Sequence, residues 1–166
     1  MEHINFISAF QKQIFSNLLA SVGFLQERNE RAERSKHYIS HKEFISEFRT
    51  IHLSYPRCVG KTTSITQLLP ILDKSNVNWI LITPNRSMYR ELRRTHPQIP
   101  ESRLFTPSRL LEVVHTLYLG TDNRPVDIIL FDEVSLKDRT SVIEELEDYI
   151  YIDDNNTGIL SIGTDK

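Results

Sequence analysis

Residues 55–63 carry the side chains and the spacing of a phosphate-binding loop. The segment reads Tyr-Pro-Arg-Cys-Val-Gly-Lys-Thr-Thr, follows the short apolar run 51–54, and precedes a helical pattern that begins at Ser64. Backbone N–H groups of such a turn, together with the positive end of the next helix, bind phosphate oxygens. We expect Lys61 to neutralise the β- and γ-phosphates of a nucleoside triphosphate, and the Thr62 hydroxyl to complete a magnesium shell.

One position departs from the usual pattern of this loop, Gly-x-x-x-x-Gly-Lys-[Ser/Thr]. Tyr55 stands where the first glycine belongs. Because Gly-Lys-Thr alone is a short motif, an ordinary strand-to-helix turn with an exposed lysine is the alternative. Cys58, the single cysteine of the chain, lies inside the segment as either a small filler residue or an oxidation switch.

A second segment, residues 126–133, supports the phosphate-binding interpretation. Its apolar run 128–131 is typical of a strand buried on both faces of a parallel sheet, and Asp132 and Glu133 follow directly. At the tip of this strand Asp132 is placed to hold magnesium, directly or through water. Glu133 is the natural general base for an attacking water. The alternative is a pair of surface acids that merely ends a strand.

The elements that must position these residues alternate along the chain. Apolar periodicity predicts strands at 50–54, 77–83, 103–105, 128–131 and 158–162, and helices at 4–22, 41–48, 64–72, 87–95, 108–119 and 140–150. Pro70 is expected to kink or end its helix, and 26–36 to form a solvated helix or an exposed linker. The alternation predicts an α/β fold with a mainly parallel central sheet and a site at the carboxyl ends of its strands. We expect an N-terminal helical segment, 1–48, packed on a core of residues 49–166.

Composition agrees with one globular domain. The chain has 166 residues, of which 39% are hydrophobic and 25% charged. No apolar stretch reaches bilayer-spanning length and the start lacks a secretory pattern, so we expect no membrane association and a cytoplasmic location. One cysteine excludes an intramolecular disulfide and a cysteine-rich metal site. The net charge of −2 gives no overall reason to bind nucleic acid.

Several short segments between residues 50 and 166 resemble, in the right order, a family of P-loop ATPases of the RecA-like (ASCE) type. The similarity is to the ATPase domain of phage terminase large subunits and the first motor domain of superfamily-two helicases. Terminase loops often lack the first glycine and carry an arginine, as here. The segments are 57–62 (phosphate loop), 81–85 (after the second strand), 105–111 (like the Thr-Pro-Gly-Arg-Leu element that touches the nucleic-acid backbone), 131–134 (Asp-Glu motif) and 160–164 (the Ser/Thr-rich third motif that couples hydrolysis to movement).

The resemblance implies a three-layer RecA-like P-loop fold that hydrolyses ATP with Mg²⁺ as cofactor. It implies Lys61, Glu133 and Arg57 as catalytic residues, with Arg57 as a cis-acting arginine on the γ-phosphate; a solvent-facing loop residue is the alternative for Arg57. Thr62 and Asp132 would hold the metal. The implied nucleotide-binding residues are Gln11, Pro56, Arg57, Cys58, Val59, Gly60, Lys61, Thr62, Thr63 and Thr164.

Two of these assignments rest on a motif of their own. Thr164, at the end of the last strand, is a candidate γ-phosphate sensor. Phe10 and Gln11 resemble an aromatic-Gln element that reads adenine, and an ordinary polar position on the first helix is the alternative for Gln11.

Partners and purpose are also implied by the resemblance. DNA is expected to contact the arginine-rich segment 86–109, in which Arg86, Arg90, Arg93, Arg94, Arg103 and Arg109 outnumber Glu91 and Glu101. The alternative is that these arginines pair with the acidic segment 144–154. Further copies of the chain, or a separate nuclease or motor subunit, are additional expected partners. A motor of the viral DNA-packaging type would work in the host cytoplasm. The alternative function is a regulatory or assembly subunit that binds nucleotide with little turnover and docks onto a motor or nucleic-acid complex.

Overall fold

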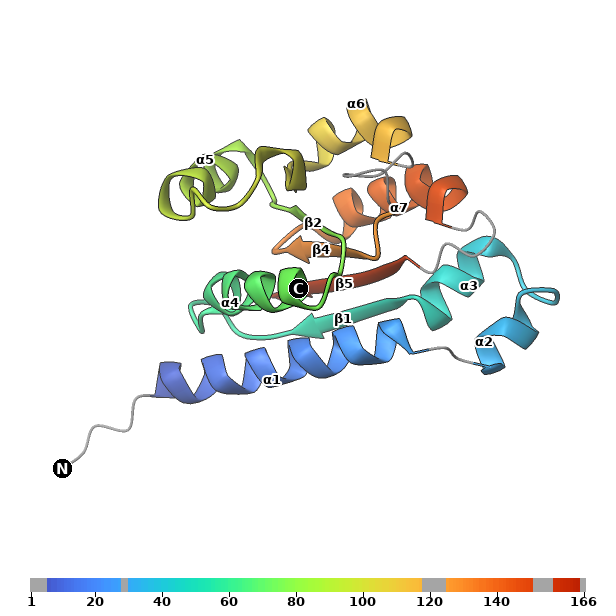
Figure 1. The fold of residues 1–166 in the computed structure, drawn as a ribbon, viewed down its shortest axis with the longest axis horizontal. Coiled ribbons are helices and arrows are strands. Elements are labelled where there is room, and N and C mark those ends of the chain that lie inside the picture. The colour runs from blue at the N-terminus through green and yellow to red at the C-terminus, as the bar shows by residue number, and fades with distance from the viewer. Residues whose placement is uncertain (1–5, 28–29, 118–124, 151–156, 165–166) are drawn as a thin grey trace.

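A five-stranded parallel β-sheet forms the centre of the chain, with helices on both of its faces (Figure 1). The computed structural model describes residues 6–27, 30–117, 125–150 and 157–164. Its strands follow the order β1-β5-β4-β2-β3, and every neighbouring pair is parallel. The predicted α/β class and parallel sheet are therefore confirmed. The strands are β1 (Thr50–Ser54), β2 (Trp79–Ile82), β3 (Leu104–Phe105), β4 (Ile128–Asp132) and β5 (Gly158–Gly163).

The helices lie close to their predicted positions. They are α1 (Phe6–Gln26), α2 (Glu30–Ser35), α3 (His41–Phe48), α4 (Lys61–Lys74), α5 (Arg86–Thr95), α6 (Pro107–Leu117) and α7 (Leu136–Ile150), with a 3₁₀ turn at Glu101–Arg103. Helix α7 begins four residues earlier than its apolar pattern predicts, because Ser135 caps it by accepting a 3.1 Å hydrogen bond from the Asp138 amide. Residues 4–5, at the start of the predicted helix 4–22, and residues 118–119, at the end of the predicted helix 108–119, lie outside the described residues.

The core has two halves, one on each face of the sheet. Successive side chains of a strand point to opposite faces, so Trp79 and Leu81 of β2 pack with α1, α4 and α5. Ile80 and Ile82 pack with α3, α6 and α7 on the other side. The result is a helix–sheet–helix arrangement of three layers, compatible with a three-layer α/β fold.

Helix α4 does not end at Pro70. It continues to Lys74, with Leu68, Leu69 and Leu72 almost fully buried. A proline inside a helix costs about 3 kcal/mol. Burying three leucines contributes more than that, since each is worth roughly 1.5–3 kcal/mol.

The strand order decides which loops become neighbours. The phosphate-loop strand β1 and the Asp-Glu strand β4 do not pair with each other, because β5 lies between them. All three strands end at the same edge of the sheet, so residues that follow them meet there. Helix α1 runs beside α4 and also contacts β5 (Figure 1). None of the described helices combines the length and the apolar character needed to cross a membrane.

Candidate functional site

The loop between β1 and α4 has the backbone of an anion-binding turn. Gly60, the N-cap of the 14-residue helix α4, has φ of 87°, and Cys58 has φ of 57°. Val59, between these two left-handed residues, does not have a positive φ. Alternating handedness of this kind turns successive N–H groups into a concave nest, and the helix N-terminus adds its partial positive charge. This backbone geometry is typical of turns that bind an anion such as a phosphate.

Lys61 places its ammonium at the centre of the site, with its side chain buried. The ammonium donates hydrogen bonds to the carbonyls of Pro56, at 2.7 Å, and Tyr55, at 3.3 Å. It also donates to Thr164 Oγ1 at 3.1 Å and forms an ion pair with Glu133 Oε1 at 2.6 Å. One cation therefore joins the loop after β1, Thr164 at the end of β5 and Glu133, which directly follows β4.

Thr62 and Asp132 form the second pair of the site. The Thr62 hydroxyl donates a 2.7 Å hydrogen bond to Asp132 Oδ2. Asp132 is 1% exposed, and its Oδ1 has no hydrogen-bond partner among the described residues. Burial raises the pKa of Asp132 to about 6 and the charge of Glu133 adds to the rise, while the Thr62 hydrogen bond and Lys61 act in the opposite direction.

This oxygen pair fits a magnesium ion. A buried carboxylate oxygen without a partner, next to a hydroxyl, supplies the hard ligands that Mg²⁺ prefers. Within the described part of the chain, no group of three or more His, Cys, Asp or Glu side chains could hold a metal. Mg²⁺ suits such a sparse set because it usually takes its remaining ligands from water and from substrate phosphates.

Glu133 has a backbone conformation that is uncommon for its residue type. Its φ of 55° is left-handed, which costs a residue with a Cβ on the order of 1–3 kcal/mol. Its amide donates to the Ile162 carbonyl at 2.9 Å. Its carboxylate accepts hydrogen bonds from the Thr164 amide at 3.1 Å and from Thr164 Oγ1 at 3.2 Å. The carboxylate is thereby directed toward the end of β5 and Lys61 and stays partly exposed to solvent.

Gln11 is brought to the loop from far upstream in the sequence. A Cβ on Gly60 would lie 2.5 Å from Cγ and 2.8 Å from Cδ of Gln11, so the two residues are in direct contact and only glycine fits. The Ser64 hydroxyl also donates to the Gln11 carbonyl, at 3.4 Å. In contrast, the side chains of Arg57, Cys58 and Thr63 are exposed. They make no hydrogen bond or ion pair with the residues that the structure describes.

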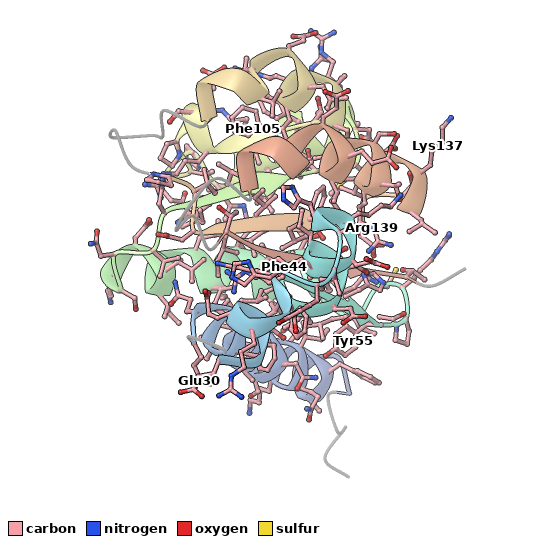
Figure 2. The ribbon with its side chains drawn as sticks, turned by 90° about the vertical axis from the view of Figure 1, so that its right-hand side faces the viewer. Glu30, Phe44, Tyr55, Phe105, Lys137 and Arg139 are labelled. Carbon is pink, nitrogen blue, oxygen red and sulfur yellow. The ribbon has the colours of Figure 1, made fainter. Side chains whose placement is uncertain are left out.

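A polar cluster that the sequence did not reveal lies beside the site. Arg139 of α7 donates from Nη1 to Ser161 Oγ at 2.8 Å and contacts His52 Nδ1 at 2.6 Å. The sheet register places His52 directly opposite Ser161, so β1, β5 and α7 meet at this cluster. Figure 2 shows Arg139 on the same side of the molecule as Tyr55 of the phosphate loop. Alternation along the strands could have paired His52 with Ser161, but nothing in the sequence points to Arg139.

A cavity of about 590 Å³ lies at the same edge of the sheet, beside the ends of β2 and β3. It is lined by residues from 84–89 and 106–112 together with Asp138. Arg86 and Arg109 contribute positive charge and Glu112 and Asp138 negative charge. Two of the segments picked out by the resemblance, 81–85 and 105–111, thus share one cavity.

Most of the arginines in the segment 86–109 are held by their own neighbours. Arg93 Nη1 donates to the Ile99 carbonyl at 2.8 Å, and Arg94 pairs with Glu91 at 2.7 Å. Arg103 pairs with Asp73 at 3.1 Å and places its guanidinium over the Trp79 ring. Arg109 pairs with Glu101 at 3.3 Å and donates to the Tyr89 hydroxyl at 2.7 Å. None of these partners belongs to the acidic segment 144–154, of which the structure describes side chains only for residues 144–146. The side chains of Arg86 and Arg90 are exposed and make no hydrogen bond or ion pair with described residues.

Comparison of the chain with protein-family models and with curated protein sequences finds no match. Its function must therefore be inferred from the arrangement of its own residues.

Proposed function

We propose that the chain is a magnesium-dependent ATPase, the motor core of a terminase- or helicase-like DNA translocase of the viral packaging type. One observation carries the proposal: an ammonium and a hydroxyl from the first turn of α4 meet two carboxylates from the end of β4 and the residue after it, at one edge of the sheet. They are Lys61, Thr62, Asp132 and Glu133, joined by contacts of 2.6 and 2.7 Å. They lie next to a helix N-terminus and a nest of backbone N–H groups, as binding and cleaving a triphosphate requires.

Each residue has a role in this proposal. The N–H groups of the loop and the ammonium of Lys61 bind the β- and γ-phosphates. Thr62 and Asp132 would hold Mg²⁺, which when bound neutralises charge on the same phosphate oxygens. Glu133 orients a water and accepts its proton while the water oxygen bonds to the γ-phosphorus. The bond from that phosphorus to the β–γ bridging oxygen then breaks, and the electron pair leaves with ADP.

The Lys61–Glu133 ion pair links nucleotide binding to the availability of the base. Phosphate oxygens compete with the Glu133 carboxylate for the same ammonium, so a bound γ-phosphate weakens the pair. Glu133 keeps its two hydrogen bonds from Thr164 and stays at the site. Binding thus frees the carboxylate for water without releasing it from the end of β5.

DNA is the proposed partner at the cavity beside β2 and β3. The support is the resemblance of one lining segment, 105–111, to an element that touches the nucleic-acid backbone, together with the exposed guanidinium groups of Arg86 and Arg90. Phosphate contacts from arginine supply sequence-independent affinity.

One observation favours the alternative of a regulatory or assembly subunit with little turnover. The side chain of Arg57 is exposed and none of the described residues holds it toward the site. A γ-phosphate in the loop then lacks the transition-state cation that is worth about 10³–10⁵ in turnover in related chemistry. A chain of this kind would bind nucleotide and turn over slowly unless a partner supplies that cation.

Steady-state phosphate release, measured with and without DNA, separates these functions. Wild type, Lys61→Ala and Glu133→Gln are compared with Glu144→Gln, a surface change on α7, as the matched control. Turnover in wild type and the control but not in Glu133→Gln supports the ATPase. Nucleotide binding without turnover, unchanged by Glu133→Gln, supports the regulatory subunit. Absence of nucleotide binding by wild type would overturn both.

A further inference from the structure

Helix α1 contacts the loop 55–60 at both ends of the loop. At the start of the loop, the side-chain amide of Asn17 donates a hydrogen bond to the hydroxyl of Tyr55. At the other end, the side chain of Gln11 packs directly against Gly60. The two contacts lie about 1.7 turns apart on α1, since a turn of helix has 3.6 residues. The helix therefore spans the loop.

The main chain of Tyr55 belongs to the site itself. Its carbonyl accepts a hydrogen bond from Lys61 Nζ at 3.3 Å, and its amide donates to the Gly163 carbonyl at 2.9 Å. A shift of Tyr55 therefore moves an acceptor of the Lys61 ammonium and changes the distance between the loop and the end of β5. Tyr55 lies at the edge of the molecule in Figure 2, with its ring partly buried against the core.

We propose that Asn17 and Tyr55 are positioning residues, which hold the start of the phosphate loop in its binding conformation through their hydrogen bond. Tyr55 occupies the position at which the usual loop has a glycine. This chain fixes that end of the loop through a side chain anchored to α1. The role of the pair in nucleotide affinity rests on the proposed function, whereas the anchoring of the loop does not require it.

Loss of the hydrogen bond between Asn17 and Tyr55 should weaken nucleotide binding by changing the conformation of the loop. When only a fraction of the molecules has the competent loop, the apparent dissociation constant rises by the inverse of that fraction. Removing one hydrogen bond corresponds to a factor of about 3–10. We expect Tyr55→Phe and Asn17→Ala each to raise the dissociation constant for magnesium with a non-hydrolysable ATP analogue by about that factor. The double variant should be no weaker than the weaker single variant, because both changes remove the same bond.

Ser21→Ala is the matched control on the same helix. The Ser21 hydroxyl donates to the Asn17 carbonyl at 2.7 Å and does not contact the loop. This variant should leave the dissociation constant for the analogue unchanged. A purely structural role for α1 predicts instead that all three variants behave alike.

A second measurement needs no nucleotide. Cys58 is the single cysteine of the chain and is exposed within the loop, so a nitroxide spin label attached there reports the motion of the loop. We expect narrower resonance lines, and therefore faster motion, in Tyr55→Phe and Asn17→Ala than in wild type or Ser21→Ala.

The two readouts separate the inference from the proposed function. Spectra and dissociation constants equal to wild type in both variants would overturn the inference. If the label moves faster in the two variants but neither they nor wild type bind nucleotide, the anchoring role is supported and the ATPase is rejected.

Discussion

The ammonium of Lys61 and the carboxylate of Glu133 lie 2.6 Å apart, although they follow different strands of the sheet. The lysine side chain is 4% exposed and the glutamate side chain 35% exposed. A buried ammonium without a partner carries a desolvation cost of several kcal/mol, which a close carboxylate offsets. Glu133 therefore has two tasks in the proposed enzyme: it balances the charge of Lys61 and serves as the base.

The first prediction follows from these two tasks. Glu133→Gln removes the charge that competes with the γ-phosphate for Lys61, so we expect it to tighten ATP binding by about threefold to tenfold. The same change should abolish phosphate release, since an amide cannot accept the proton of the attacking water. Equilibrium binding and steady-state turnover check the two effects. Weaker binding together with retained turnover would reject both roles of Glu133.

The second prediction concerns the stability of Asp132→Asn. Burial raises the folded-state pKa of Asp132 to about 6, above its ordinary value of 3.8. The ionised carboxylate therefore destabilises the fold at neutral pH, and we expect the variant to have a higher free energy of unfolding by roughly 1–3 kcal/mol. Magnesium-dependent nucleotide binding should disappear at the same time. A variant less stable than wild type at pH 7 would contradict the prediction.

The pH dependence of that difference has a definite sign. Between about pH 4 and 6 the native state holds the Asp132 proton that the unfolded state has released, so wild-type stability falls, relative to the variant, as the pH rises. Above about pH 6 both states are ionised and the difference is constant. Denaturant titrations of both proteins from about pH 4 to 8 measure this curve. A difference that shrinks as the pH rises would exclude a raised pKa at Asp132.

The third prediction compares two glycines. Gly60→Ala should destabilise the fold by roughly 2–4 kcal/mol, because alanine is strained at φ of 87° and its Cβ would overlap Gln11. Gly23→Ala on α1 is the control: nothing lies within 4 Å of the new Cβ, and we expect a gain of about 0.5–1 kcal/mol. Chemical denaturation distinguishes them. Equal effects at both positions would show that the backbone of the loop is not constrained.

The fourth prediction assigns the DNA interaction to particular arginines. Arg86→Ala with Arg90→Ala should weaken DNA binding at low salt and reduce the salt slope by about 0.9 for each phosphate that the variant no longer neutralises. Arg94→Ala is the control, since Arg94 is paired with Glu91. Arg93 is unsuitable for this test because it also bonds to the Ile99 carbonyl. Binding that is equally weak in the control, or indifferent to salt, would argue against DNA binding at this surface.

The buried strands could be predicted because the side chains on both of their faces meet the apolar core. The run 128–131 is apolar throughout, and the structure buries every residue of β4. The site could be anticipated because parallel strands end at one edge, which brings Lys61 toward Glu133. Local patterns of this kind depend only on neighbours in the sequence and on the common direction of the strands.

The contacts between side chains from distant elements could not be predicted. Nothing in the sequence shows that Asn17 of α1 meets Tyr55, or that Arg139 meets Ser161, since both depend on how helices settle against the sheet. The contacts of the individual arginines could not be predicted for a similar reason. Their spacing suggests one continuous basic surface, but the fold uses Arg103 to bind Asp73 and cover Trp79.

Strand β5 ends next to Thr164, which is hydrogen-bonded to Lys61 and Glu133, and it begins against the C-terminal end of α1. Thr164 holds Glu133 and Lys61, while a Cβ on Gly158 would lie 3.0 Å from Leu25. The strand is about 20 Å long at roughly 3.3 Å per residue, and it is hydrogen-bonded on both sides, so it resists stretching. In the proposed enzyme, a displacement of Thr164 on phosphate loss would therefore be passed along β5 toward Leu25 at the far end of α1.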